Sequence, residues 1–183
     1  MITERLQKAI NDKITAELWS SNLYLQMAYF FKREGWDGFA HWMELQAVEE
    51  REHATKMGDF LVERGGTVKL QMIDVVPEGW GSPLEVFEHT YSHECRVSRM
   101  IDGIVTLAIA EKDYAAENFF RTFVDEQEFD RLGVFASSPE EDTPAAIMDE
   151  QVEEEATASG IVDKIKKVGE TGLFFLDSQL GKR

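Results

Sequence analysis

Proline occurs at only four positions in this chain of 183 residues: Pro77, Pro83, Pro139 and Pro144. A proline ring lacks a backbone donor and clashes with the preceding turn, so helix interiors exclude it. The four positions therefore leave three long blocks in which helices are permitted. Alternating patterns typical of strands are nearly absent from these blocks. The sequence thus predicts an all-α chain.

The first block, up to about residue 64, is itself divided by turn residues. The segment EGWDG at 34–38 places a glycine on each side of a tryptophan, which is typical of a short turn between helices. We therefore expect two antiparallel helices in this block. From 65 to 83 the sequence loses its helical periodicity and carries turn residues at both ends, which indicates a long connection.

A third helix is predicted from Pro83 to about Glu111, with Ser82 as its N-cap. Lys112 and Asp113 then mark a tight reversal into a fourth helix. Helices of this length reach roughly 40 Å at ~1.5 Å per residue. Long helices with one long connection, here between the second and the third, are typical of a four-helix bundle with a single crossover.

Acidic residues dominate the charge balance. Asp and Glu number 35 against 19 Lys and Arg, a formal net charge of −16. Such a surface repels phosphate backbones, so nucleic acid is not an expected partner. Cys95 is the only cysteine, which excludes an intramolecular disulfide and favours a reducing compartment. No apolar run suits a signal peptide or a membrane span, so we expect a single cytoplasmic domain over 1–183 without membrane contact.

Each predicted helix has an apolar stripe that polar groups interrupt near its middle. Steps of three and four residues place Glu17 on the first stripe, Glu50 and His53 on the second, Glu94 on the third and Gln127 on the fourth. In a bundle these side chains share one buried layer, where bare carboxylates repel one another. One or two bound cations make such a layer favourable, and Glu50 and His53, three residues apart, reach a single ion. The pattern therefore predicts a metal site.

Several segments together resemble the non-haem ferritins of bacteria and archaea. They are AELWSSNLYLQMAYFF, GFAHWM followed by EEREH, ERGGTVKL, FEHTYSHE, FVDEQ and GLFFLDSQL, which span nearly the whole chain. The resemblance implies a ferritin-like four-helix bundle with a short C-terminal helix over 172–180. It also implies iron storage: a di-iron ferroxidase centre oxidises ferrous iron with oxygen or hydrogen peroxide, and a hollow homo-oligomeric shell of twenty-four subunits holds the ferric mineral.

The resemblance also assigns roles to residues. Glu17, Glu50 and His53 would bind the first iron, Glu50 would bridge, and Glu94 would bind the second iron. Gln127 would lie beside the second iron, either as a weak ligand or as a residue that contacts the ligands and not the metal. These assignments place both irons within one subunit.

Further roles follow from the same resemblance. Tyr24, one helical repeat after Glu17, would be a redox-active or hydrogen-bonding neighbour, and Glu49 with Glu126 would form an additional iron site. Haem is not expected, because Arg51 stands where the related bacterioferritins carry methionine.

The fourth helix carries an inserted segment at about 128–151. It contains two prolines and repeats the tripeptide Asp-Glu-Gln, which ends at Gln127 and again at Gln151, 24 residues later. Two copies thus compete for one place, and the uninterrupted connection from the third helix favours Gln127 at the iron site. If the second copy takes that place, Gln151, Glu153 and Glu154 supply the wall. A third reading has the final helices pack on a neighbour and change the number of subunits.

Other functions and features remain to be weighed. A rubrerythrin-like di-iron peroxidase uses the same bundle but normally adds a cysteine-rich module, which one cysteine does not build. A helical shell or scaffold protein with assembly altered by the insertion is the non-enzymatic alternative. His89 and His93, four residues apart, lack an evident third metal ligand, so we expect them to face solvent.

Overall fold

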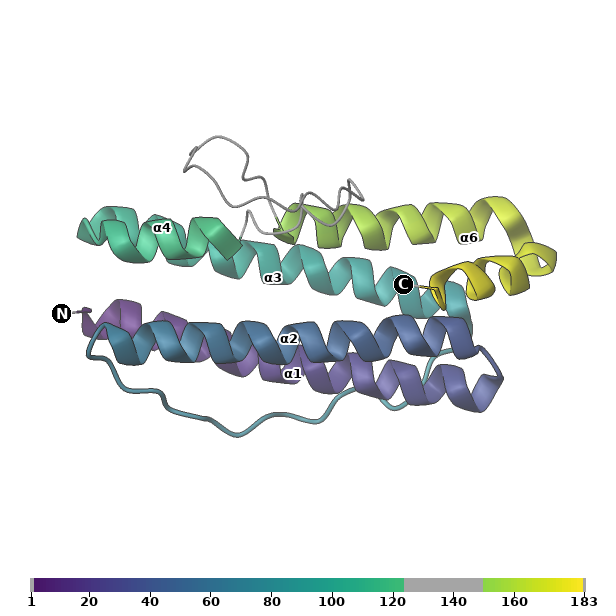
Figure 1. Cartoon of the computed structure of the whole chain (residues 1–183), viewed down its shortest axis with the longest axis horizontal. Coiled ribbons are helices and arrows are strands. Elements are labelled where there is room, and N and C mark those ends of the chain that lie inside the picture. The colour runs from purple at the N-terminus through teal and green to yellow at the C-terminus, as the bar shows by residue number, and fades with distance from the viewer. Residues whose placement is uncertain (1, 124–149, 183) are drawn as a thin grey trace, which may run out of the picture.

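The structure, a computed structural model, describes residues 2–123 and 150–182. These residues form no strand and five helices (Figure 1): α1 Glu4–Glu34, α2 Asp37–Glu63, α3 Pro83–Glu111, α4 Tyr114–Phe123 and α6 Glu150–Leu180. The prediction of an all-α chain is confirmed for these ranges. None of their helices combines the length and the apolar character that crossing a bilayer requires.

The helices form two pairs that lie side by side (Figure 1). α1 packs along α2, while α3 packs along α4 and α6, and further contacts join α1 to α3 and α2 to α6. The connection from α2 to α3 runs along the outside of the α1–α2 pair, so α2 and α3 point the same way (Figure 1). The four-helix bundle with one long crossover is confirmed. α4 and α6 share its fourth position.

The helix ends follow local sequence signals. The Thr3 hydroxyl accepts from the Leu6 amide at the start of α1, and α1 ends at Gly35, whose φ of 81° is a left-handed conformation that suits glycine. Ser82 caps α3 as predicted, with its hydroxyl accepting from the Glu85 amide. These caps fix where each helix begins and hence which side chains share a level in the bundle.

Two hydrophobic clusters fill the bundle, and a polar layer separates them. On α1, buried Glu17 lies between Ile14 of one cluster and Leu23 of the other. Buried Glu50 takes the corresponding place on α2. The interruption of the apolar stripes is therefore a layer of buried charged groups, as the sequence indicates.

The C-terminal part of α6 folds back on the bundle after a break at Gly169, where φ is 61° and ψ is −172°. The returning piece reaches the start of α2, as Figure 1 shows in yellow. There the Phe39 amide donates to Asp177 Oδ1 at 2.7 Å. A Cβ added to Gly38 would lie 1.8 Å from the Asp177 carbonyl oxygen, so only glycine allows this approach. The expected short C-terminal helix is thus present.

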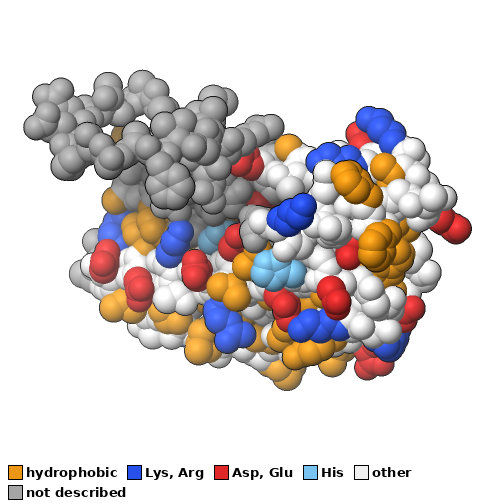
Figure 2. Space-filling view, turned by 45° about the vertical axis from the view of Figure 1, so that its right-hand side comes forward, with side chains coloured by type: hydrophobic (Ala, Val, Ile, Leu, Met, Phe, Trp, Pro, Cys, Tyr) orange, Lys and Arg blue, Asp and Glu red, His pale blue; other side chains and the backbone are white. Residues whose placement is uncertain are grey.

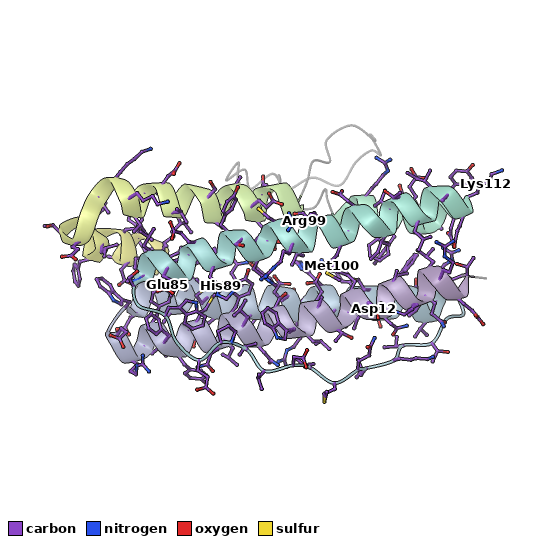
Figure 3. All side chains as sticks on the ribbon, turned by 180° about the vertical axis from the view of Figure 1, so that it is seen from behind. Asp12, Glu85, His89, Arg99, Met100 and Lys112 are labelled. Atoms are coloured by element: carbon purple, nitrogen blue, oxygen red, sulfur yellow. The ribbon has the colours of Figure 1, made fainter. Side chains whose placement is uncertain are left out.

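The outer surface mixes all types of side chain. Figure 2 shows Asp and Glu side chains interspersed with Lys, Arg and hydrophobic ones on one face. Phe174 and Phe175, near the C-terminus, are 76% and 66% exposed. The view from behind in Figure 3 shows Asp12 on α1 and Glu85 and His89 near the start of α3.

Candidate metal centre

Two groups of buried side chains in the polar layer are close enough to hold metal ions. Glu17 of α1 joins Glu50 and His53 of α2, and each offers a donor atom within 4.8 Å of the others. Glu50 also belongs to a second group with Glu94 of α3 and Glu154 of α6, within the same limit. All five side chains are buried. Four helices thus converge on one layer, and Glu50 is common to both groups.

Local helical geometry explains the first group. Glu50 and His53 are one turn apart on α2, so both project toward α1. Their Oε2 and Nδ1 atoms lie 3.9 Å apart, which is too far for a hydrogen bond and suits two ligands of one ion. At the same level, the Ser21 hydroxyl donates to the Ala47 carbonyl at 2.6 Å and ties α1 to α2.

Glu17 is paired with a buried cation. The Lys13 Nζ lies 2.6 Å from Glu17 Oε1, and both side chains are almost fully shielded from solvent. Burial raises the pKa of the Glu17 carboxyl, but the Lys13 ammonium, the adjacent Glu50 carboxyl and the nearby His53 outweigh this effect. The pKa of Glu17 therefore lies below its ordinary value, so this carboxylate is ionised at neutral pH.

Glu50 shows the opposite behaviour. Burial, followed by the charge of Glu17, raises the pKa of Glu50 well above its ordinary value. Neither Glu50 oxygen accepts a hydrogen bond from a described residue, which removes the usual stabilisation of an ionised form. Burial and the neighbouring Glu17 carboxylate therefore both favour the neutral form of Glu50. A cation that binds here displaces the proton of that neutral form.

The chemistry of the donors fits iron. The first group offers two carboxylates and an imidazole, and the second offers three carboxylates. Carboxylate oxygens suit hard cations, and a single imidazole is compatible with a ferrous ion. A carboxylate shared by two groups suits two neighbouring ions.

His93 occupies the gap between α1 and α3, contrary to the expectation that it faces solvent. It is 5% exposed, and its Nε2 lies 2.7 Å from the Ser20 hydroxyl. Because that hydroxyl donates to the Ala16 carbonyl, Nε2 is the donor in this contact. Burial, and then the positive charge of Arg96, lower the pKa of His93 to about 3. His93 is therefore neutral, and the solvent-facing interpretation was wrong because it treated one face of α3 as outward.

Tyr24 lies beside this histidine. The two ring centroids are 6.0 Å apart in an edge arrangement, and the Trp19 ring lies 5.3 Å from the His93 ring in a tilted one. Tyr24 is fully buried, yet its hydroxyl has no hydrogen-bond partner within the described part of the chain. Burying a hydroxyl without a hydrogen-bond partner destabilises the fold, so the Tyr24 hydroxyl is available to a further hydrogen-bonding group.

The other predicted site residues have different outcomes. Glu49 is half-buried next to Glu50, and its charge contributes to the raised pKa of Glu50. Gln127 and Glu126 lie outside the described residues, so the preference for the first tripeptide copy stays a prediction. Glu154, which the sequence offered with the second copy, is the α6 residue in the second donor group. In the sequence, Glu154 stands in a helical stripe with the apolar residues Ala158 and Ile161, and this position indicates that its side chain faces the bundle interior.

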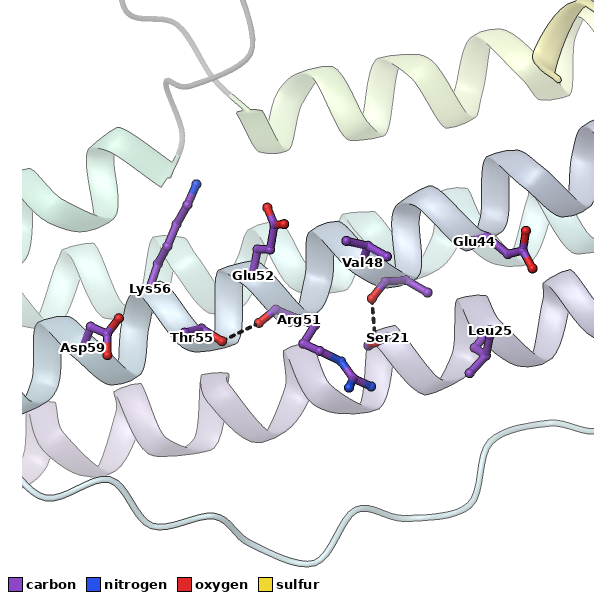
Figure 4. A pocket seen from close by; sticks show the side chains of 10 residues that line it. Ser21, Leu25, Glu44, Val48, Arg51, Glu52, Thr55, Lys56 and Asp59 are labelled. Carbon is purple, nitrogen blue, oxygen red and sulfur yellow. Dashed lines mark hydrogen bonds between the residues drawn. The ribbon is translucent and has the colours of Figure 1, made fainter. Parts of the chain in front are cut away.

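A separate groove opens on the outer face of α1 and α2 (Figure 4). Its volume is about 760 Å³, and none of the five donor residues lines it. Arg51 and Glu52 project from α2 toward this groove, whereas Glu50, their neighbour in sequence, faces the bundle interior. The candidate metal ligands and the groove thus lie on opposite faces of α2.

Comparison with known proteins gives consistent relatives. Residues 7–130 match the ferritin family, described as a ferritin-like domain. The chain is 52% identical over 183 residues to a bacterial non-heme ferritin of Bacteroides fragilis, covering 100% of both chains. It is 33% identical to a probable bacterial non-heme ferritin-like protein of Haemophilus influenzae, covering 99% of this chain and 96% of the other. A solved open pore ferritin from Archaeoglobus fulgidus superposes with a TM-score of 0.85 at 41% sequence identity. The match covers 100% of this chain and 99% of that one.

Proposed function

The chain belongs to the ferritin family, and we propose that it stores iron after oxidising ferrous ions in the buried carboxylate layer. The observation that carries this proposal is Glu50, which contributes to both donor groups. Two ions held on either side of one carboxylate are close enough for a single oxidant to take one electron from each. The ferric ions that this reaction produces are then the form in which the protein stores iron.

The side chains of this layer take distinct roles. Glu17 and His53 hold the first ferrous ion, Glu94 and Glu154 hold the second, and Glu50 bridges them. Two ferrous ions supply two electrons which, with two protons from the solvent, reduce oxygen to hydrogen peroxide or hydrogen peroxide to two water molecules, and two ferric ions result. The bridging role requires that Glu50 first release its proton. The buried position of these groups keeps bulk water away from the reacting ions.

Three further residues support the reaction in this proposal. Tyr24 lies within the same buried region and supplies a hydroxyl or an electron close to the first ion. Glu49, half-buried beside Glu50, forms with Glu126 an additional site through which iron leaves the centre. Gln127 or Gln151 completes the wall on the fourth helix.

The stored mineral requires a closed homo-oligomer. The exposed Phe174 and Phe175 rings on the returning C-terminal piece favour a neighbouring subunit over them. We expect a shell of the ferritin type. The question that follows is whether the inserted segment at about 128–151 changes the number of subunits in that shell. The mass in solution of the full chain, compared with a variant that lacks 128–151, measures this directly.

Ferrous oxidation kinetics test the activity. Two ferrous ions per subunit are mixed with the protein in air, and the ferric product is followed by its near-ultraviolet absorbance. We expect rapid oxidation by the wild type and loss of the fast phase in E50Q. E52Q is the matched control, because Glu52 carries the same charge two residues away on the exposed face of α2. Equal rates for wild type and E50Q favour the scaffold alternative.

A further inference from the structure

A lysine is completely buried beside the proposed iron centre. Lys13 of α1 has a relative exposure of 0%, and its Nζ lies 2.6 Å from Glu17 Oε1. Lysine is almost never fully buried unless it is paired, because removing an ammonium from water is costly. Lys8 and Asp12, with the same spacing one turn earlier, form their ion pair at the surface. The burial of Lys13 is therefore a property of this position and not of the helix.

The environment of the ammonium is unusual for a structural lysine. An ammonium has three donors, but within the described residues Nζ has no hydrogen bond of good geometry, and its one ion pair is with Glu17. Its charge acts on Glu50 and His93 as well as on Glu17. What keeps the ammonium in place is thus the negative charge of the carboxylate layer.

Glu17 offers its two oxygens to different groups. Oε1 faces the Lys13 ammonium, whereas Oε2 is buried without a hydrogen-bond partner among the described residues. Only Oε2 is left for a metal ion unless the ammonium moves. An ion bound through Oε2 also experiences repulsion from a positive charge that is separated from it by one carboxylate.

We propose that Lys13 is a positioning residue that acts as the internal counter-ion of the iron-free centre and weakens the hold of Glu17 on metal. This inference rests on the proposed function of the centre. Lys13 balances the ionised Glu17 when the site holds no metal and confines metal coordination by Glu17 to one oxygen. The consequence is a centre that stays folded without iron and passes iron on instead of retaining it.

Metal affinity in the intact protein tests the proposal. Co²⁺ serves as the probe, because it takes the same oxygen and nitrogen ligands and is not oxidised by air under these conditions. K13M removes the charge with similar length, and K8M is the matched control at the exposed lysine of the same helix. We expect the Co²⁺ dissociation constant to fall about tenfold or more in K13M and to stay within about twofold in K8M.

A second measurement separates this role from a merely structural one. Loss of packing would lower the melting temperature of K13M equally with and without Co²⁺. Loss of a counter-ion instead lowers it only in the metal-free protein, so saturating Co²⁺ stabilises K13M more than it stabilises the wild type. K13Q, whose amide still donates to Glu17 without a charge, serves if K13M fails to fold.

The outcomes are distinguishable from those of the proposed function. If wild type binds no more Co²⁺ than E50Q does, the metal centre itself is refuted. If wild type binds Co²⁺ at this centre and both Lys13 variants bind it equally or more weakly, the inference about Lys13 is overturned while the centre stands.

Discussion

Replacing Glu50 by glutamine is expected to stabilise the metal-free protein while removing its response to metal. Donor atoms of Glu17 and Glu50 lie within 4.8 Å of each other. Two unit charges at that separation, at an effective dielectric constant of about 20, repel by about 3.5 kcal/mol or more. E50Q removes this repulsion, keeps the shape of the side chain and provides an amide that donates to Glu17. The expected gain in unfolding free energy approaches about 3.5 kcal/mol only at a pH high enough to ionise Glu50 in the wild type.

The size of the gain depends on pH, and its sign follows from the pKa of Glu50. Burial and then the charge of Glu17 raise that pKa well above its ordinary value, so the folded protein holds this proton more tightly than the unfolded chain. The stabilisation from the bound proton is complete below the unfolded pKa and is lost as pH rises through the folded pKa. Wild type and E50Q should thus have similar stability near pH 5, and E50Q should become increasingly more stable toward alkaline pH.

Urea unfolding of chelator-treated protein from pH 5 to pH 9, at matched subunit concentrations, measures the difference. E52Q corrects for the change in net charge, because Glu52 is exposed on the same helix. Saturating Co²⁺ should reverse the order, since it stabilises wild type and not E50Q. Parallel stability profiles of wild type and E50Q across this pH range would refute the argument that Glu50 is a buried, proton-holding member of a charged layer.

Three further perturbations have definite expected outcomes. Y24F removes a buried hydroxyl without a described partner, so metal-free stability should stay equal or rise by about 1 kcal/mol in urea unfolding; stopped-flow iron oxidation should slow by about tenfold or more, and unchanged kinetics would exclude a role for the hydroxyl. G38A forces a Cβ to within 1.8 Å of the Asp177 carbonyl, so it should detach the returning C-terminal piece and cost about 2 kcal/mol, seen as faster proteolysis near the C-terminus, whereas G103A, in open space, should not accelerate it. Burial raises the pKa of Asp113, but its two 2.9 Å hydrogen bonds from Arg64 outweigh this effect and lower it. D113N removes the charge and one of the two acceptor oxygens, so the loss of about 1–2 kcal/mol at neutral pH should vanish as pH falls through that lowered pKa, and a loss that persists in acid would contradict it.

Helical periodicity was sufficient to predict the bundle and most of the donor set. Glu17, Glu50 and Glu94 stand near the middle of stripes whose ends are apolar, and a charged residue in such a stripe either faces the core or breaks the helix pattern. The prolines located the breaks, because their exclusion from helix interiors depends on no tertiary contact. These features are encoded locally, which is why the helix boundaries and the polar layer were predictable.

The roles of Glu154 and Lys13 depend on contacts that periodicity does not contain. Choosing between two copies of Asp-Glu-Gln requires knowing which segment reaches α3, and this is set by packing over many residues. Lys13 lies beside the Glu17 stripe, and a lysine at a stripe edge usually extends to solvent. Only the buried carboxylates reverse that preference: Glu17 lies on the same helix, but the packing that buries it comes from the other helices.

The two hydrophobic clusters explain why the charged layer is tolerated at all. Each cluster closes one end of the bundle with apolar packing, so the cost of the layer between them is confined to a single level. Within that level, the Lys13 ammonium offsets the charge of Glu17, and the raised pKa of Glu50 favours its neutral form. Both effects stabilise the metal-free form of the layer, and each weakens metal binding by the same free energy. A chain selected for stability alone would replace the layer with apolar residues, so its presence supports the proposed role of the layer in binding cations.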